Sequence, residues 1–498
     1  MRGKTEKESL NVSYSLAFKS FSILGLSQFF IIITSIIKSK IIAVLLGTEG
    51  FGLMGMYNTT LDLIFSIFSF GIFSSSIRNI AEESDNSESI RLSNILWAVI
   101  ALGLVVGIVC LILCMLFSPL LSSLTFGNKN FLFSFILLSL SLLFKALYSS
   151  FQAILQGLKK IKWLAMSNLY ASLLGLILSI PLFYLFSEKG IVYSILLTSF
   201  LTLIFAYVFY KKINIVPRKA SLQFYKKIVK DIVGVGFLMT FSGCILTTIV
   251  NYVLRIYILN NGGNSILGLY HAASSILVGY IGIVFNVLGT DYYPRLSSCN
   301  KNHIMVNSIF NNQLEISILV LVPLLSLIML FLQVIINVLF TSDFMPIIPL
   351  IGFALIGVVF KIIAFCISYI FLSIIAIKDY VITELIVAIL TLFLTIVFYE
   401  NYGLIGFGFA YLVVNAVYAI TITIWSFLKF KISIKRNNYI IIFISMVLLS
   451  MELLFTIFLK VYVLAIIWVF ISIGISTYIL NRRLSLLTTI RKKLGWFY

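Results

Sequence analysis

Residues 38–78 read KSKIIAVLLGTEGFGLMGMYNTTLDLIFSIFSFGIFSSSIR, and this stretch decides the fold. It predicts parts of two apolar helices joined by a short turn at Gly47–Gly52. The full apolar runs on either side are long enough to cross a bilayer, yet they hold Lys38, Lys40 and Asp62. Because a charge that faces lipid costs about 3 kcal/mol or more, these side chains are expected to face a protein-lined, wet interior.

A similar pattern returns about 213 residues later. Arg255 lies in a second apolar run, the polar turn NNGGNS follows, and another helix begins near Gly268. Six helices per repeat bring the chain back to the same side of the membrane, so we expect two parallel repeats around a central cavity. The matching positions are Gly55–Tyr57 with Gly268–Tyr270 and Gly190 with Gly403 at a shift of 213, Lys40 with Arg255 at 215, and Lys145 with Lys361 at 216.

Composition places the whole chain in a membrane. Its 498 residues are 61% hydrophobic and 11% charged, with a mean hydropathy of +1.12. A soluble protein of this size needs far more polar surface. The net charge of +19 is explained by basic loops kept in the cytoplasm rather than by nucleic-acid binding.

No pattern for catalysis or metal binding is found. The five cysteines form no CxxC pair, and the two histidines have no cluster of ligands beside them, so neither a disulfide framework nor a metal site is indicated. The P-loop pattern for ATP is missing, and so is a Ser/His/Asp arrangement. The sequence therefore predicts no catalytic residues, no metal and no cofactor, with proton or sodium coupling left open.

The predicted architecture is an all-α polytopic membrane protein with about fourteen spanning helices. The ninth helix is overlong and contains Pro323, so a kink or a projecting end is expected there. The domains are an N-terminal lobe (1–210), a basic linker (211–230), a C-terminal lobe (231–428), and two extra helices with a basic tail (429–498). The predicted spans are 20–46, 53–77, 92–117, 131–157, 163–186, 190–210, 232–259, 265–293, 306–340, 346–377, 380–399, 403–428, 438–459 and 461–480.

Loop charges orient these spans. With both termini in the cytoplasm, 28 of the 36 basic residues fall on cytoplasmic segments and three on outer segments, Lys129, Lys189 and Lys460. This asymmetry agrees with retention of basic loops inside. The remaining five cations lie within spans, where Asp62 is the acid nearest to them in depth.

Each charge within a span has a structural and a functional interpretation. Lys38 and Asp62 either neutralise one another between adjacent helices or take part in substrate binding and ion coupling, and both alternatives stay open. Lys145 and Lys361 fall near mid-membrane, where snorkelling is difficult, so a cavity position is favoured. Arg255 lies nearer the outer surface, and snorkelling or a cavity position explains it equally well.

The cytoplasmic ends of two helices also carry charges. Arg78 ends the second helix, and Asp291 and Arg295 end the eighth. At the shift of 213, Arg78 matches Asp291 and Glu82 matches Arg295, so cross-pairing could form an inner gate. Simple interfacial anchoring is the alternative and the favoured one.

A resemblance to a known family follows from these residues. The run KIIAVLLGTEGFGLMGMYNTTLDLIFSIFSFGIFSSSIRNIAE resembles the first hairpin of bacterial O-antigen and oligosaccharide flippases (Wzx-type) of the multidrug/oligosaccharidyl-lipid/polysaccharide exporter superfamily. DYYPRLS after the eighth helix and GLKKIKW after the fourth resemble the same family. The fourteen helices depart from the twelve of many members and are similar to the lipid II flippases (MurJ-type), in which the extra pair builds a lipid-tail groove.

The resemblance implies alternating access and translocation of an undecaprenyl-pyrophosphate-linked oligosaccharide from the cytoplasmic to the outer leaflet of the bacterial inner membrane. The excess of cations favours an anionic group such as pyrophosphate. The predicted substrate-binding residues are Lys38, Lys40, Lys145, Arg255 and Lys361, and the predicted coupling residue is Asp62. Expected partners are the lipid-linked oligosaccharide, membrane lipids, and a polysaccharide polymerase with its chain-length regulator. The alternatives are a lipid II flippase, a drug/cation antiporter and a membrane-embedded polymerase.

Overall fold

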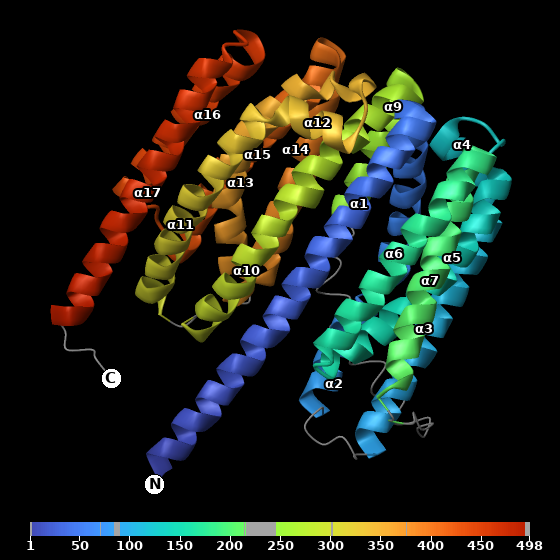
Figure 1. Ribbon diagram of the computed structural model, residues 1–498, viewed down its shortest axis with the longest axis horizontal. Coiled ribbons are helices and arrows are strands. Elements are labelled where there is room, and N and C mark those ends of the chain that lie inside the picture. Colours follow the sequence, from blue (N-terminus) through green and yellow to red (C-terminus); the bar gives the residue numbers. More distant parts are fainter. Residues whose placement is uncertain are drawn as a thin grey trace. The chain divides into compact units, whose positions relative to one another are not determined.

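The computed structural model describes the backbone of residues 2–69, 71–83, 90–213, 215, 246–299, 302–374 and 376–493. Side chains are described from Phe30 to Arg482 within these ranges, except at Thr290 and Asp291. The described backbone is helical with short connections and contains no strand, and it forms two compact units, Met1–Leu267 and Gly268–Tyr498 (Figure 1). The all-α architecture is therefore confirmed.

The first unit holds the hairpin predicted from residues 38–78 and the helices that pack around it. Its described helices are α1 (Arg2–Ser69), α2 (Ile72–Glu83), α3 (Ile90–Leu116), α4 (Ser118–Phe126), α5 (Leu132–Gly157), α6 (Ile161–Phe186), α7 (Lys189–Lys211) and most of α9 (Leu246–Ser274). Helix α5 packs against α3 and α7, and α6 packs against α1 and α7.

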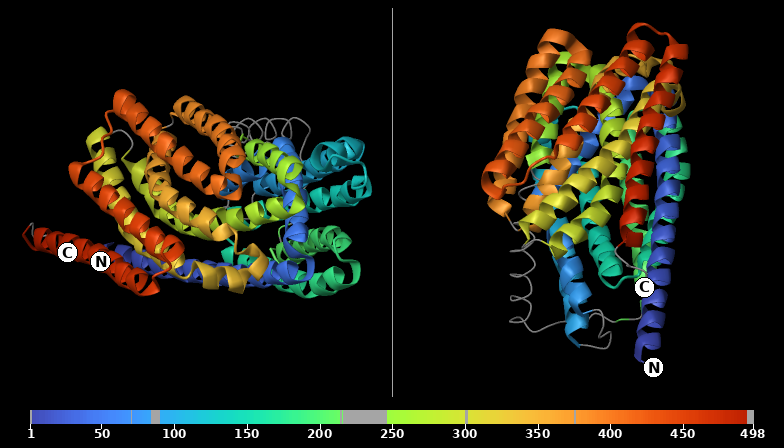
Figure 2. Two further views of the ribbon diagram at one scale, coloured as in Figure 1. Left: turned by 90° about the horizontal axis from the view of Figure 1, so that it is seen from above. Right: turned by 90° about the vertical axis from the view of Figure 1, so that its left-hand side faces the viewer.

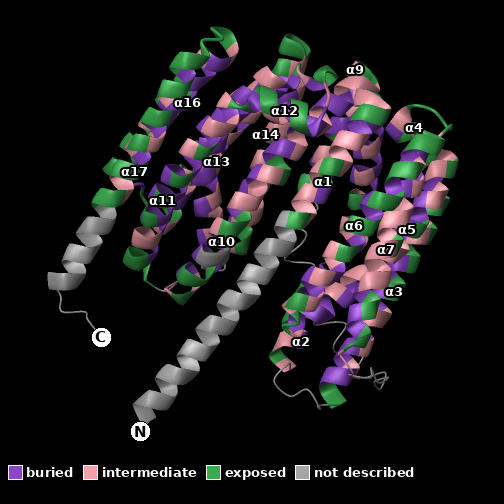
Figure 3. Cartoon of the chain, viewed as in Figure 1, coloured by how far each residue is buried: buried purple, intermediate pink, exposed green. Residues whose placement is uncertain are grey.

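The second unit begins in the last part of α9. Its other helices are η2 (Ser275–Tyr280), α10 (Ile281–Ser298), α11 (His303–Leu330), α12 (Leu332–Leu339), η3 (Ser342–Phe344), α13 (Ile347–Ser373), α14 (Ile377–Tyr402), η4 (Gly403–Ile405), α15 (Gly406–Phe430), α16 (Arg436–Leu453), η5 (Leu454–Phe458) and α17 (Tyr462–Lys493). Helix α13 is mostly buried because α10, α11, α15 and α16 pack around it (Figure 3).

Eleven helical stretches among the described residues are long and apolar enough to cross a membrane. Three of them, Phe30–Ser69, Leu246–Ser298 and Ile377–Phe430, are 40 to 54 residues long, about twice the length that one crossing needs. Each of the three contains a glycine with positive φ, at Gly47, Gly263 and Gly403. We count each as two spans, so the prediction of about fourteen spanning helices is confirmed. The protein is a multi-pass membrane protein.

The predicted turn at Gly47–Gly52 is tighter than expected. The chain leaves helical geometry at Gly47 alone, where φ is 62° and ψ is −161°. Gly263 does the same in α9, with φ of 71° and ψ of −177°. A side chain is strained in this conformation, which explains a glycine at both places. The Thr48 and Ser265 hydroxyls, just after these turns, are hydrogen-bonded at 2.8 Å.

Corresponding backbone features of the two repeats are separated by 216 residues. Gly47 and Gly263 are 216 apart, and so are Ser187 and Gly403, which share a φ of 50–59°. A β-carbon at Gly190 would clash with the Leu182 carbonyl oxygen, and one at Gly406 would clash with that of Phe398. Gly190 therefore corresponds to Gly406, and the predicted match of Gly190 with Gly403 is wrong by three residues.

The break in the ninth predicted span does not lie at its proline. Helix α11 runs through Pro323 without interruption and ends at Leu330, and Phe331 separates it from α12. Phe117 separates α3 from α4 in the same way. The predicted second span, 53–77, is interrupted near Gly71, which has a φ of 63° and precedes α2. The helix therefore ends near a glycine with a left-handed backbone conformation, and not where the apolar run of residues ends.

The C-terminal helices α16 and α17 dock on the second unit. They run side by side (Figure 2), and both pack against α11. Asn438 donates to the backbone oxygen of Asn311 (2.9 Å) and to its side-chain oxygen (3.1 Å). Asn311 in turn donates to the Ser433 carbonyl (2.9 Å) and accepts from the Lys435 amide (2.7 Å). Both asparagines are buried, so each bond is costly to lose.

The predicted lobe boundaries stay predictions. Most of the basic linker, residues 216–230, lies outside the described residues, as does the start of the seventh predicted helix. The division into compact units falls later, between Leu267 and Gly268 within α9.

Candidate functional site

The first unit pairs two of the predicted site residues across helices. Lys145 of α5 donates to Asp62 of α1 at 2.5 Å, and its ammonium also lies 4.8 Å from the centre of the Phe65 ring. Asp62 and Phe65 are three residues apart, so they share one face of the helix. Of the two alternatives for Lys38 and Asp62, mutual neutralisation is not seen in the described contacts, in which Asp62 accepts from Lys145 and Lys38 donates to Thr198.

This ion pair is accessible. The side chains of Lys145 and Asp62 are 36% and 59% exposed. Protein packing therefore does not block the approach of another group to either partner.

Lys38 lies nearby on the first half of α1 and points to α7. Its ammonium donates to the Thr198 hydroxyl at 3.4 Å, and the Thr198 hydroxyl itself donates to the Ser194 carbonyl at 2.6 Å. A hydroxyl leaves the ammonium its full charge, unlike a carboxylate. Lys40, two residues further on, is half-buried.

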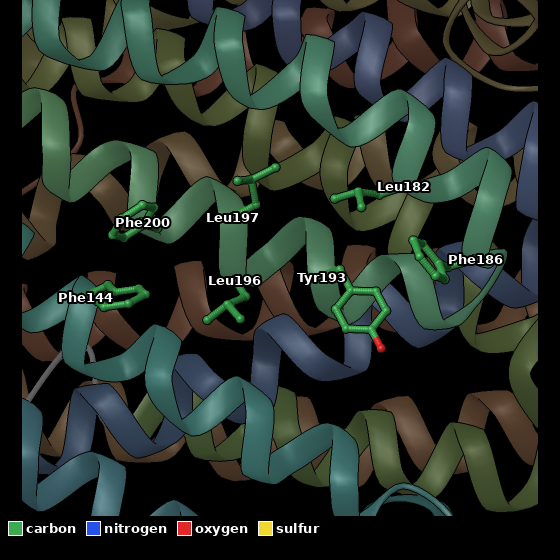
Figure 4. A pocket seen from close by; sticks show the side chains of 7 residues that line it. All are labelled: Phe144, Leu182, Phe186, Tyr193, Leu196, Leu197 and Phe200. Carbon is green, nitrogen blue, oxygen red and sulfur yellow. The ribbon is translucent and has the colours of Figure 1, made fainter.

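An apolar groove is also found in the first unit. It has a volume of about 520 Å³, and its lining residues come from α5, α6 and α7. The ring pair Phe144–Phe200 lies at one end, the pair Phe186–Tyr193 at the other, and leucines lie between them (Figure 4). Phe144 directly precedes Lys145, and the lining residue Leu197 directly precedes Thr198. Helices α5 and α7 of the first unit thus carry both polar site residues and apolar groove residues.

The second unit holds its matching lysine differently. Lys361 of α13 donates to the Tyr411 hydroxyl of α15 at 3.3 Å. Its ammonium lies 5.6 Å from the Phe285 ring and 5.7 Å from the Tyr411 ring. Aromatic faces attract a cation without cancelling its charge. This lysine therefore presents a positive charge.

Arg255, the last of the predicted substrate-binding cations, lies on α9 eight residues before the turn at Gly263. The residue is 8% exposed. This burial favours an interior position over snorkelling, which would bring the guanidinium to a wet surface.

The predicted gate residues have partners close to their own helices. Arg78 forms an exposed ion pair with Glu82 on α2 at 2.9 Å. Arg295 of α10 donates to the Gln313 side-chain oxygen of α11 at 2.6 Å. The side chain of Asp291 lies outside the described residues, so the gate stays a prediction.

Several residues of these clusters were missed by sequence reasoning. Thr198, Tyr411, Phe65 and Phe285 are common residue types, and the sequence carries no signal that places them beside a lysine. Among the described residues, no three His, Cys, Asp or Glu side chains are grouped to hold a metal ion. The described polar clusters are suited to binding an anion and to exchanging a cation or a proton.

Several solved structures share this fold. A multidrug-resistance MATE transporter of the MOP superfamily, in an inward-facing conformation, is 18% identical with a TM-score of 0.69, covering 80% of this chain and 94% of the other. The lipid II flippase MurJ in an inward closed conformation is 18% identical with a TM-score of 0.69, covering 93% and 99%. A MOP-superfamily transporter from Pyrococcus furiosus, described for the reversed polarity of its binding pocket, is 17% identical with a TM-score of 0.55, covering 83% and 94%. The fold is that of the MATE and MurJ transporters.

The family is shown by sequence. The model of the polysaccharide biosynthesis protein family matches residues 17–300, more than half of the chain, and the chain belongs to this family. Among curated proteins, none matches the sequence.

Proposed function

We propose that this protein is a flippase that moves an undecaprenyl-pyrophosphate-linked oligosaccharide from the cytoplasmic to the outer leaflet of the bacterial inner membrane. It works by alternating access, with both termini in the cytoplasm. Membership of the polysaccharide biosynthesis protein family and the fold shared with MurJ and MATE transporters support this proposal.

One observation carries the proposal beyond the family. The Lys145 ammonium belongs to α5 and the Lys38 ammonium of α1 reaches Thr198 of α7, and residues of α5, α6 and α7 also line an aromatic, leucine-rich groove. A lipid-linked sugar phosphate likewise combines an anionic head group with an apolar tail. Lys145 and Lys38 bind the pyrophosphate, together with Lys361, Lys40 and Arg255, because ammonium and guanidinium groups are good donors to phosphate oxygens. The groove receives the first part of the tail.

Asp62 supplies a means of coupling. While it accepts from Lys145, the lysine is neutralised. When a proton or sodium ion occupies the carboxylate, Lys145 is released for the substrate. Entry of the ion thereby favours binding of the anionic head group, with no organic cofactor required. A polysaccharide polymerase and its chain-length regulator receive the product on the outer face.

The experiment measures where the lipid-linked intermediate accumulates in a deletion strain, using a probe that reacts only at the outer face. We expect intact intermediate on the inner leaflet, relieved by the wild-type gene but not by a Lys145→Met/Lys361→Met double variant. Intermediate that reaches the outer face and stays unpolymerised would contradict the flippase and favour the polymerase. An unchanged distribution would favour a drug or ion transporter.

A lipid II flippase is the second candidate, favoured by one observation. The MurJ structure covers 93% of this chain, whereas the MATE structure covers 80%. The matched control is rescue of a strain depleted of its own lipid II flippase. Rescue of this strain, without relief of the oligosaccharide phenotype, would replace the first proposal by the second.

A further inference from the structure

Glu452 is a carboxyl group buried within the membrane-spanning part of the second unit. The residue is 0% exposed, and neither carboxyl oxygen has a hydrogen-bond partner among the described residues. It lies on α16, six residues before the end of η5. Buried charges are normally paired, and an unpaired carboxylate in apolar surroundings is unfavourable. The protonated acid is the form that these surroundings accommodate.

The helices around Glu452 are packed closely. On α13, a β-carbon at Gly352 would lie 2.5 Å from the side chains of Leu453 and Ile457. On α17, the Trp468 indole donates to the Leu448 carbonyl at 2.9 Å, one turn before Glu452. Phe455 meets the Trp468 ring edge to face at 5.9 Å. Because these contacts exclude water from this side of α16, the carboxyl cannot be hydrated unless they loosen.

Among the described residues, no neighbouring charge is seen to pair with a carboxylate at this position. The elements that pack against α16 are α11, α13, α17 and the adjoining η5, which has no titratable residue. The titratable or charged residues with described side chains on these elements and on α16 itself are His303 and Glu315 on α11, Lys361, Cys366 and Tyr369 on α13, Arg436 and Tyr439 on α16, and Tyr462, Tyr478 and Arg482 on α17. None of these donates a hydrogen bond to the Glu452 carboxyl.

The backbone just beyond Glu452 provides a place for movement. Residues Leu454–Phe458 form the π-helical segment η5, in which the Thr456 hydroxyl donates to the Glu452 carbonyl at 2.7 Å. A π-helical turn is wider than an α-helical one and often lies at functional positions, because it can convert to an α-helical turn with a shift of the following residues. Such a shift would move α17 relative to α16.

We propose that Glu452 is a proton-binding site that controls the packing of α16 and α17. With the proton bound, the neutral acid remains buried and the two helices keep their contacts. When the proton passes to water, the carboxylate has to be hydrated, so the contacts around Trp468 loosen. This switch is independent of which substrate the protein carries, and the failure of one proposal leaves the other intact.

Trp468 reports on this switch directly. The measurement is the fluorescence of the full-length protein in lipid nanodiscs between pH 5 and 9, with the Trp468 contribution obtained by subtracting the Trp468→Phe variant. We expect a titration of the Trp468 emission that is lost in Glu452→Gln, which mimics the neutral acid in shape. The matched control is Glu384→Gln, because Glu384 accepts from the Tyr418 hydroxyl at 3.1 Å and lies away from Trp468 on α14. The control should keep the titration.

An emission that does not change with pH in the wild type, or a titration that persists in Glu452→Gln, overturns the proposal. If Glu452→Gln folds poorly, Glu452→Asp replaces it and should retain a titration with a displaced midpoint. A second readout is modification by dicyclohexylcarbodiimide, an apolar reagent that attacks protonated carboxyl groups. We expect several-fold more adduct on the peptide containing Glu452 at pH 6 than at pH 9. An equal yield at both values would contradict proton exchange at this residue.

Discussion

Lys145 and Lys361 are 216 residues apart, at matching positions of the two repeats, but they are held by different groups. Lys145 donates to the carboxylate of Asp62, whereas Lys361 donates to the neutral hydroxyl of Tyr411. Each ammonium also lies over a phenylalanine ring, Phe65 in one unit and Phe285 in the other. Both lysines therefore contact a phenylalanine ring, whereas the carboxylate partner, Asp62, belongs to the first unit.

Because of this difference, we expect the two lysines to have different roles. Under the proposed function, Lys145 would be a switchable anion site, because its carboxylate partner has to be displaced before it binds the substrate. Lys361 would be a standing anion site, because its hydrogen-bond partner is a neutral hydroxyl. The predictions below test whether this asymmetry is needed.

Removing the standing charge should have the largest effect. We expect Lys361→Met to lower transport about 10- to 100-fold, because a hydrogen bond between charged partners is worth about 1.5–3 kcal/mol. Lys361→Arg is the control that keeps the charge. Transport is measured as the initial rate of appearance of the lipid-linked sugar on the outer face of proteoliposomes. A wild-type rate in Lys361→Met would remove this lysine from the site.

The switchable pair should give a non-additive result. In Lys145→Met the carboxylate of Asp62 remains alone and repels the anionic head group, so we expect a loss of about tenfold, equal to about 1.4 kcal/mol. Adding Asp62→Asn removes this repulsion, and the double variant should transport faster than Lys145→Met alone. It should also lose its dependence on the driving ion. Strict additivity in the double-mutant cycle would show that the pair does not act as a unit.

Sequence reasoning succeeded for properties that depend on the length and composition of a segment. It failed for properties that depend on how helices face one another. Long apolar runs and loop charges predicted fourteen spans, since these depend on length and composition. The partner of Asp62 was not predictable: Lys145 is 83 residues away, and only packing of α1 beside α5 brings it within 2.5 Å. A sequence gives the depth of a side chain in the membrane, not the direction it faces.

The repeat and Glu452 illustrate two further limits. Matches between identical residue types suggested a shift of 213, whereas backbone conformation at Gly47 and Gly263 gives 216. The lone acid in the apolar run of α16 was visible in the sequence. The sequence alone does not predict that this acid is completely buried.

Introducing an acid into the second unit should make the two sites alike. Asp62 precedes Phe65 by three residues, and Gly282 precedes Phe285 by three, so Gly282→Asp places a carboxylate one helical turn from the ring that lies 5.6 Å from the Lys361 ammonium. An added β-carbon at Gly282 meets no atom within 4 Å, so space is available. We expect transport to fall about three- to tenfold as Lys361 is neutralised. Gly282→Asn is the uncharged control, and an equal loss in both variants would point to crowding instead of charge.

The smallest expected effect comes from the Tyr411 hydroxyl. In Tyr411→Phe the 3.3 Å hydrogen bond to Lys361 is lost, while the ring that lies 5.7 Å from the ammonium stays. A hydrogen bond of this length is near the limit of useful geometry, and its net contribution is at the lower end of about 0.5–1.5 kcal/mol. We therefore expect a two- to threefold loss of transport, with the Lys361→Met/Tyr411→Phe double variant no slower than Lys361→Met. If Tyr411→Phe instead proved as slow as Lys361→Met, the hydroxyl would itself contact the substrate, and the second site would be a tyrosine–lysine pair in place of a lysine held by aromatic rings.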